Sequence, residues 1–325
     1  MHTRFSPYSP PHLNAQSVQE GGTGGEAELV GETAHRLLSN GFSGSVLAAV
    51  SKAVYLVDSA ERVIWLGQSG RATGGSPLPA HPRAIHAPFA PNLFRVGMAC
   101  RSDQERLWFD NGASVIWRNT PVWHPPSLPA LAPITQVHAH AQQLSETLAT
   151  LNCDESMAQA LFTMLRLRQA DQRVSPIILD ALREVIDSCS RQDIAVVAQT
   201  GRALVGLGPG LTPSGDDFLG GLFFALYYLQ AAYQDTRWDW QPVQSLLDWA
   251  RTRTNLISYT LLTDHAQGQG VKPLHTLLIA LFEGQAVHVA MEHAQQLITI
   301  GHTSGWDILA GAFTGMLTFG QNVGV

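Results

Sequence analysis

Charged residues are scarce in this sequence of 325 residues. Only 14% of them are Asp, Glu, Lys or Arg, against about 25% in an average soluble domain. So few charges cover the surface of a monomer sparsely, which predicts a large buried core or a subunit interface, such as that of a homo-oligomer. The 20 basic residues form no dense run and are outnumbered by 26 acidic ones, so we expect no nucleic-acid partner.

Cysteine pairs and long apolar runs are also missing. Cys100, Cys153 and Cys189 stand far apart without a CxxC pair, which argues against a disulfide framework or structural zinc and fits a cytoplasmic protein. The most apolar segment, residues 218–233, is interrupted by glycines. It is shorter than the roughly 20 residues of a membrane helix, so we predict a buried helix and no membrane contact. Residues 1–25 lack the apolar core of a signal peptide and are predicted to be a disordered lead-in.

Residues 26–122 have the pattern of a small, mostly antiparallel, barrel-like β domain. A short helix is expected at its start, and a long excursion at residues 68–93, which are rich in Gly, Pro and Ala. Asn111-Gly112 favours a tight hairpin turn, because both residues tolerate positive φ. Short runs with strand composition lie at residues 45–50, 53–58, 62–66, 105–109 and 113–117.

The pattern changes after a proline-rich linker at residues 123–131. From residue 132 to 325, apolar residues recur at helical spacing. They predict an all-α domain of about nine helices, one of them capped by Ser175 before Pro176. The fold class is therefore α+β, with the β domain first.

The most informative segment is the glycine loop, residues 206–217, which holds four glycines and two prolines in its first ten residues. Such a loop has a defined shape, and two chemistries suit it. In the first, backbone amides, hydroxyls and the following helix N-terminus bind a small anion such as phosphate or a carboxylate. The residues expected to do so are Gly208, Gly210, Thr212, Ser214 and Gly215.

The second chemistry uses the two carboxylates at the end of the loop. Asp216 and Asp217 could act as acid and base, and Asp217 could bind a divalent cation such as Mg²⁺. A simpler interpretation stays open, in which the carboxylates stabilise the helix N-terminus and the glycines only form a turn.

Part of the loop is repeated about 90 residues later. Ser304-Gly305-Trp306-Asp307 aligns with Ser214-Gly215-Asp216-Asp217, and an apolar helix follows each segment. We call these two helix starts the first corner and the second corner, and we expect that they could meet across one cleft. Ser304, Gly305 and Asp307 are therefore candidate site residues, although a chance match of common helix-start residues would look the same.

Three further residues are candidates on their chemistry. His302, beside the second corner, and His265 could carry protons. Arg253 could bind the carboxylate of a substrate, or it could simply be a solvated helix end.

Three segments together resemble a known family. Residues 206–221, residues 253–258 and residues 301–307 are similar to the three characteristic blocks of the AllH-type subunits of oxamate carbamoyltransferase. The resemblance implies a multi-subunit enzyme of purine nitrogen metabolism, linked to allantoin degradation. With FdrA-like and further partner subunits, it would interconvert oxamate plus carbamoyl phosphate with oxalurate plus phosphate.

The function predicted is therefore that of a subunit in a carbamoyltransferase-type enzyme that acts on a small carboxylate or amide. Two alternatives remain open at this point. One is a non-catalytic subunit that binds a metabolite or assists assembly, and the other is a metal-dependent hydrolase that uses the paired Asp corners.

Overall fold

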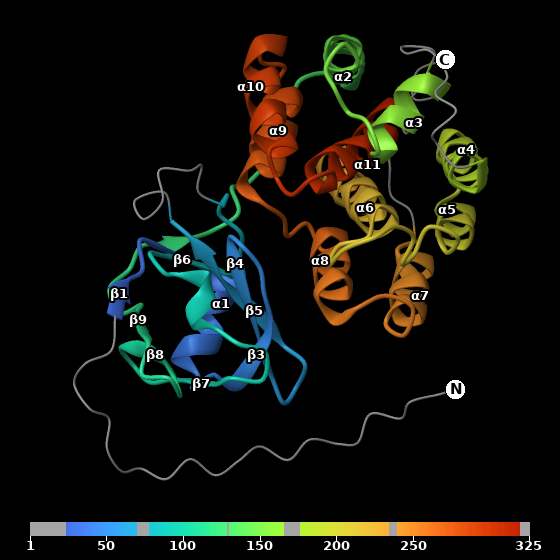
Figure 1. Ribbon diagram of the computed structural model, residues 1–325. Helices are drawn as coiled ribbons and strands as arrows, with labels where there is room; N and C mark the ends of the chain where they lie inside the picture. The colour runs from blue at the N-terminus through green and yellow to red at the C-terminus, as the bar shows by residue number, and fades with distance from the viewer. Residues whose placement is uncertain (1–23, 70–77, 129, 166–175, 234–238, 319–325) are drawn as a thin grey trace, which may run out of the picture.

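The computed structural model describes residues 24–69, 78–128, 130–165, 176–233 and 239–318. The lead-in predicted for residues 1–25 lies almost entirely outside these ranges, as does Ser175. Strands occupy the chain between residues 24 and 123, here called the β region, and helices follow from residue 134 to 318, the helical region. The two regions lie side by side (Figure 1).

The β region is one ten-stranded sheet that curls into a half-barrel around a helix. Its strand order is β1-β9-β8-β7-β3-β4-β5-β6-β2-β10. Six neighbouring pairs are antiparallel and three are parallel, which confirms the mostly antiparallel, barrel-like α+β prediction. The strands are β1 (Gly24–Glu26), β2 (Leu29–Gly31), β3 (Ser43–Ala49), β4 (Ala53–Asp58), β5 (Val63–Gln68), β6 (Ala84–Ala87), β7 (Ala99–Ser102), β8 (Arg106–Phe109), β9 (Ser114–Ile116) and β10 (Val122–Trp123).

Two sequence predictions for this region have different outcomes. The hairpin at Asn111-Gly112 is confirmed, since β8 pairs antiparallel with β9 and Gly112 has a φ of 84°. The excursion predicted for residues 68–93 is wrong in part, because β6 lies within it and pairs parallel with β5. A four-residue strand without alternating polarity, flanked by prolines, gave no strand pattern.

Both faces of the sheet are covered near its middle. On the concave face, α1 (Glu32–Ser39) packs its Leu38 into a core with Leu56 and Ile64. On the opposite face, Trp65 packs with Leu261 from the helical region. This double coverage explains why Val63 to Gly67 are all buried.

The helical region contains ten α-helices in its described part, one more than predicted. They are α2 (Ile134–Leu148), α3 (Met157–Met164), α4 (Pro176–Ser190), α5 (Ile194–Gly201), α6 (Ser214–Ala232), α7 (Gln241–Ala250), α8 (Leu256–Ala266), α9 (Lys272–Phe282), α10 (Val287–Ile298) and α11 (Ser304–Thr318). A short 3₁₀ helix, η1 (Pro91–Leu93), lies in the β region. Within the described ranges, the helices fall short of the length and apolar character that a membrane span requires.

The centre of the helical region is the crossing of α6 and α11 (Figure 1). A Cβ on Gly311 would lie 1.8 Å from the carbonyl oxygen of Phe218, and one on Gly221 would lie 1.9 Å from that of Ile308. Glycine is therefore required for the two backbones to approach so closely. The first twelve residues of α6 after Ser214 are all buried.

Candidate functional site

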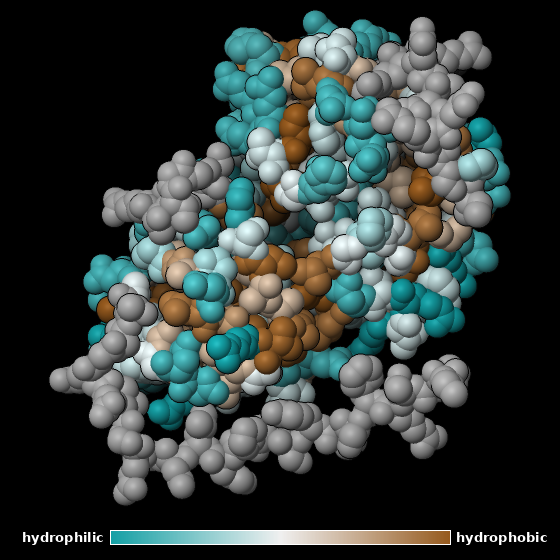
Figure 2. Space-filling view, in the orientation of Figure 1, coloured by the Kyte–Doolittle hydropathy of each residue, from teal (hydrophilic) through white to brown (hydrophobic). Residues whose placement is uncertain are grey.

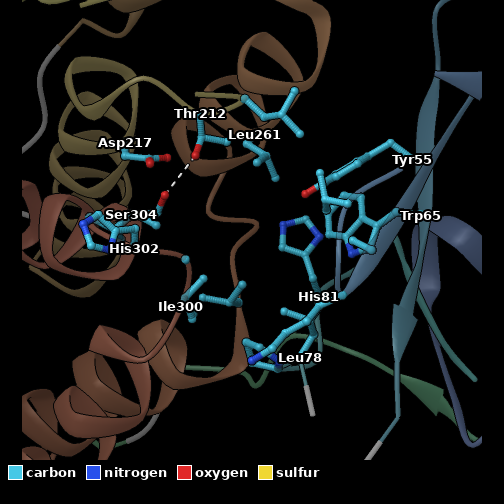
Figure 3. A pocket seen from close by; sticks show the side chains of 18 of the residues that line it. Tyr55, Trp65, Leu78, His81, Thr212, Asp217, Leu261, Ile300, His302 and Ser304 are labelled. Carbon is cyan, nitrogen blue, oxygen red and sulfur yellow. Dashed lines mark hydrogen bonds between the residues drawn. The ribbon is translucent and has the colours of Figure 1, made fainter. Parts of the chain in front are cut away.

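A cavity of about 440 Å³ lies between the β region and the helical region. We call it the central cavity (Figure 3). The residues that face each other across it come from both regions. They include Lys52, Tyr55, Trp65 and His81 on the sheet side, and Thr212, Asp217, Leu261, His265, Ile300, His302 and Ser304 on the helix side.

The two corners meet at the wall of this cavity, as the sequence repeat suggested. The Thr212 and Ser304 hydroxyl oxygens are 2.9 Å apart and form a hydrogen bond (Figure 3). The serine of each corner interacts with the aspartate of the other corner. The Ser304 hydroxyl interacts with Asp217, and the Ser214 hydroxyl interacts with Asp307. The N-termini of α6 and α11 therefore converge on one place.

Each corner owes its shape to its glycine. A Cβ on Gly215 would lie 1.9 Å from the Leu204 carbonyl oxygen, and a Cβ on Gly305 would lie 2.0 Å from that of Leu297. The two contacts are equivalent, so the same backbone approach is built twice. Gly215 and Gly305 thus have a packing reason for their place in the motif, whatever they contribute to binding.

Asp217 is the carboxyl group that faces the cavity. Its residue is only 4% exposed, and its Oδ2 has no hydrogen-bond partner within the described chain. Burial, helped by the charge of Asp307, raises its pKa well above the ordinary value, although the hydroxyls of Ser304 and Thr212 oppose this shift. Such a group is a candidate acid or base.

Asp307 is buried behind the cavity wall and is not among the residues that line it. Its Oδ1 accepts a 2.6 Å hydrogen bond from the backbone N–H of Met157, the first residue of α3. Burial raises its pKa to about 6, although the bond from Met157 and the hydroxyl of Ser214 act in the opposite direction. Asp307 therefore ties the second corner to α3.

Asp216 fixes the glycine loop. Its Oδ1 accepts a hydrogen bond from the Gly206 N–H at 2.8 Å, and its Oδ2 accepts from the hydroxyls of Thr254 at 2.5 Å and Ser258 at 2.7 Å. This carboxylate is thus engaged at both oxygens and is not among the residues that line the central cavity. Residues 253–258, the second of the three segments that resemble the family, thus supply two of the hydrogen bonds that hold Asp216 of the loop.

The loop itself lies between two cavities. Gly208 and Gly210 have φ values of 117° and 96°, which only glycine adopts readily. On its outer side is a second cavity of about 490 Å³, the outer cavity, lined by Glu155, Pro209, Gly210, Leu211, Thr212, Ser214, His302, Thr303 and Ser304. Four residues border both cavities: Leu211, Thr212, His302 and Ser304.

The remaining candidates lie in different surroundings. His302 is exposed, with its Nε2 3.6 Å from a Glu155 carboxylate oxygen. His265 is buried at the central cavity, where burial lowers its pKa to about 4. The Arg253 side chain is exposed and stacks 4.9 Å over the Trp249 ring, outside the residues that line either cavity.

A metal site does not emerge around Asp217. In the part of the chain that the structure describes, no group of three or more His, Cys, Asp or Glu side chains could hold a metal ion. The charges of Asp307 and Asp216 both act on Asp217, and its other neighbours are the hydroxyls of Ser304 and Thr212. Asp216, however, is already hydrogen-bonded at both oxygens, and Asp307 does not line the cavity. The residues present therefore do not fit the Mg²⁺ suggested from the sequence.

The sequence interpretation missed the sheet side of the cavity. Tyr55 and Trp65 lie on neighbouring strands with their rings 5.6 Å apart, and the His81 ring lies 4.7 Å from Trp65. Burial, helped by the charge of Asp217, raises the pKa of Tyr55 to about 12. Aromatic residues on the outward face of two paired strands were a signal that this face is covered.

Comparison with known proteins supports the family resemblance. Residues 204–316 match the family described as oxamate carbamoyltransferase subunit AllH, which confirms the resemblance drawn from the sequence. The matched segment, about a third of the chain, contains both corners but none of the β region. No solved structure gave a significant match.

Proposed function

We propose that this chain is a subunit of a carbamoyltransferase-type enzyme and that its central cavity binds the small carboxylate or amide that receives the carbamoyl group. The match of residues 204–316 to the AllH subunit of oxamate carbamoyltransferase links the chain to such an enzyme. The expected reaction is transfer from carbamoyl phosphate to oxamate, which gives oxalurate and phosphate.

The observation that carries the proposal is the meeting of the two corners at Asp217. Two helix N-termini point their positive ends at one wall of the cavity, which favours negative charge developing there. While the Ser304 hydroxyl interacts with Asp217, the Thr212 hydroxyl can rotate away from its present partners and donate a hydrogen bond to the oxygen of a carbamoyl group. Asp217 stands beside both hydroxyls.

The chemistry requires a proton acceptor. When the amide nitrogen of oxamate attacks the carbamoyl carbon, a C–N bond forms, phosphate leaves, and the nitrogen loses one proton. Asp217 is placed to take up that proton, and its raised pKa makes the ionised form a stronger base than an ordinary carboxylate. We place the leaving phosphate in the outer cavity, where Ser214, Thr303 and the two helix N-termini could bind it. The carboxylate of Glu155, which also lines this cavity, would repel the phosphate.

Partner subunits are part of the proposal. The family name describes a subunit, and FdrA-like proteins are the partners expected from the resemblance. Apolar side chains gather on the lower face of the β region in Figure 2. Val96, in this region, is 72% exposed, and such surface suits a protein that works beside others.

The test is turnover by the reconstituted complex. We expect oxalurate to form from oxamate and carbamoyl phosphate, and Asp217→Asn to lower the rate by about 100-fold or more, as loss of an acid or base does. Asp248→Asn, which changes an exposed carboxyl on α7, is the matched control and should leave the rate unchanged. Circular dichroism would verify that both variants fold.

Two results would contradict the proposal. Full activity of Asp217→Asn would remove the corners from the chemistry. If ligand raised the melting temperature of this chain, yet only variants of the partner subunits stopped turnover, the chain would be a non-catalytic binding or assembly subunit.

A further inference from the structure

Two buried polar atoms without partners face the central cavity from opposite sides. One is Oδ2 of Asp217, in the helical region, and the other is Nε2 of His81, in the β region. His81 is 1% exposed and Asp217 is 4% exposed. Buried polar atoms usually have partners, so these two atoms, which line the same cavity, are the places where a ligand in it could form hydrogen bonds.

The hydrogen bonds around His81 determine what it offers. Its Nδ1 accepts a 3.2 Å hydrogen bond from the backbone N–H of Arg83. Burial and the neighbouring His265, Arg83, His275 and His86 lower its pKa well below the ordinary value, so the ring is neutral. The single proton of a neutral ring then sits on Nε2, which is a hydrogen-bond donor facing the cavity (Figure 3).

Arg83 holds this donor in place. Its guanidinium donates two hydrogen bonds to Asp264, at 2.5 and 2.7 Å, and a third to the Val63 carbonyl at 3.2 Å. The loop that carries His81 is thereby attached to α8. Since Asp264 neutralises Arg83, this guanidinium is not available to a ligand in the cavity.

The rest of the lining favours an uncharged ligand group. Trp65, Leu261 and Ile300 present apolar surface. Of the described residues that line the cavity, Lys52 alone is a lysine or arginine, and it is exposed. An oxyanion placed between His81 and Asp217 would therefore have no buried cation beside it, whereas an amide group needs none.

We propose that His81 is a ligand-binding residue that recognises the carbonyl oxygen of an uncharged amide or ureido group, while the N–H groups of that ligand face Asp217 Oδ2. The β region thus completes a site whose other half lies in the helical region. This inference rests on the proposed function, because it concerns the ligand of the same cavity.

The experiment is calorimetric titration of the full chain alone with oxamate and with oxalate, in which a carboxylate replaces the amide. We expect oxamate to bind about tenfold or more tightly than oxalate. His81→Leu should weaken oxamate binding by about tenfold or more, because the carbonyl oxygen loses its donor. His81→Gln, whose side-chain N–H can stand in for Nε2, should recover part of that affinity.

A matched control is available on the same sheet. His86 is also buried with an unpartnered Nε2, but it does not line the cavity, so His86→Leu should leave oxamate binding unchanged. The inference is overturned if oxamate does not bind, if oxalate binds equally well, or if His81→Leu binds oxamate like the unaltered chain.

The failure of this inference can be distinguished from failure of the proposed function. A complex that forms oxalurate while His81→Leu keeps full oxamate affinity would overturn only the role of His81. Binding of oxamate that depends on His81, in a complex that transfers no carbamoyl group, would overturn only the proposed function.

Discussion

The Asp307→Asn variant tests whether ionisation of the buried carboxyl group of the second corner lowers the stability of the folded chain. The folded chain raises the pKa of Asp307 from 3.8 to about 6. Between these values, the folded state keeps a proton that the unfolded state releases. Stability from this group is therefore complete below about pH 4 and falls as pH rises towards 6.

The size of the effect follows from the shift. A difference of about two pH units corresponds to about 3 kcal/mol of lost stability at pH 7, and roughly half of that loss is already present at pH 5. Asparagine cannot ionise, yet its side-chain oxygen can still accept the hydrogen bond from Met157. The unfolding free energy of the variant, relative to that of the unaltered chain, should therefore rise by about 1 kcal/mol between pH 5 and pH 7.

The measurement is urea unfolding of both proteins at pH 5, 6, 7 and 8, with the difference in unfolding free energy plotted against pH. Any constant effect of the substitution cancels in the slope of that plot. Buried His265 and His86, whose pKa values fall to about 4, make both proteins lose stability below pH 6.5. Their contribution cancels in the difference as well.

Asp103→Asn is the matched control. Asp103 is an exposed carboxylate. Burial acts to raise its pKa, but hydrogen bonds from Trp108 and from the backbone of Glu105 and Arg106 together outweigh that effect and lower the pKa. Its contribution changes only at pH values below those of the assay, so its difference plot should be flat. A flat or falling plot for Asp307→Asn would refute the reasoning about the second corner.

Two further substitutions test the packing. Gly311→Ala should destabilise the chain by about 2 to 3 kcal/mol in urea unfolding, because its Cβ would overlap the Phe218 carbonyl; Gly41→Ala, in open space at positive φ, should cost only about 1 kcal/mol. Arg83→Ala should cost about 3 to 5 kcal/mol, because it leaves a buried carboxylate unpaired. Arg251→Ala, which breaks an exposed ion pair to Glu61 in the turn between β4 and β5, should change stability little. Equal losses in the two arginine variants would contradict the view that burial makes the Arg83–Asp264 pair important.

The sequence predicted the elements that have local patterns. Alternation and turn residues identified β4, β5 and the hairpin at Gly112, and helical spacing identified the helical region. It missed β6 because that strand is buried on both faces and joins its neighbour in parallel, a contact that no local pattern records.

The same distinction between local patterns and tertiary contacts applies to the candidate site. Both corners were found from the sequence because a repeated motif within one chain is visible without a structure. His81 was not found, because it lines the same cavity as Asp217 only through the packing of the β region on α8, to which the long-range pair Arg83 and Asp264 contributes. Residues that are brought together by tertiary contacts alone have no characteristic spacing in the sequence, so the sequence does not predict them.

The two corners share a motif but differ in one residue, and this difference separates their roles. Asp216 of the first corner corresponds to Trp306 of the second. Asp216 accepts a hydrogen bond from the backbone N–H of Gly206 and so holds the glycine loop. Asp217, whose Oδ2 has no hydrogen-bond partner within the described chain, faces the cavity instead. Trp306 instead packs against Phe162 of α3, and Asp307 accepts a hydrogen bond from the N-terminus of the same helix. The second corner is thus bound to its neighbour, and it supports the first by donating the Ser304 hydroxyl to Asp217.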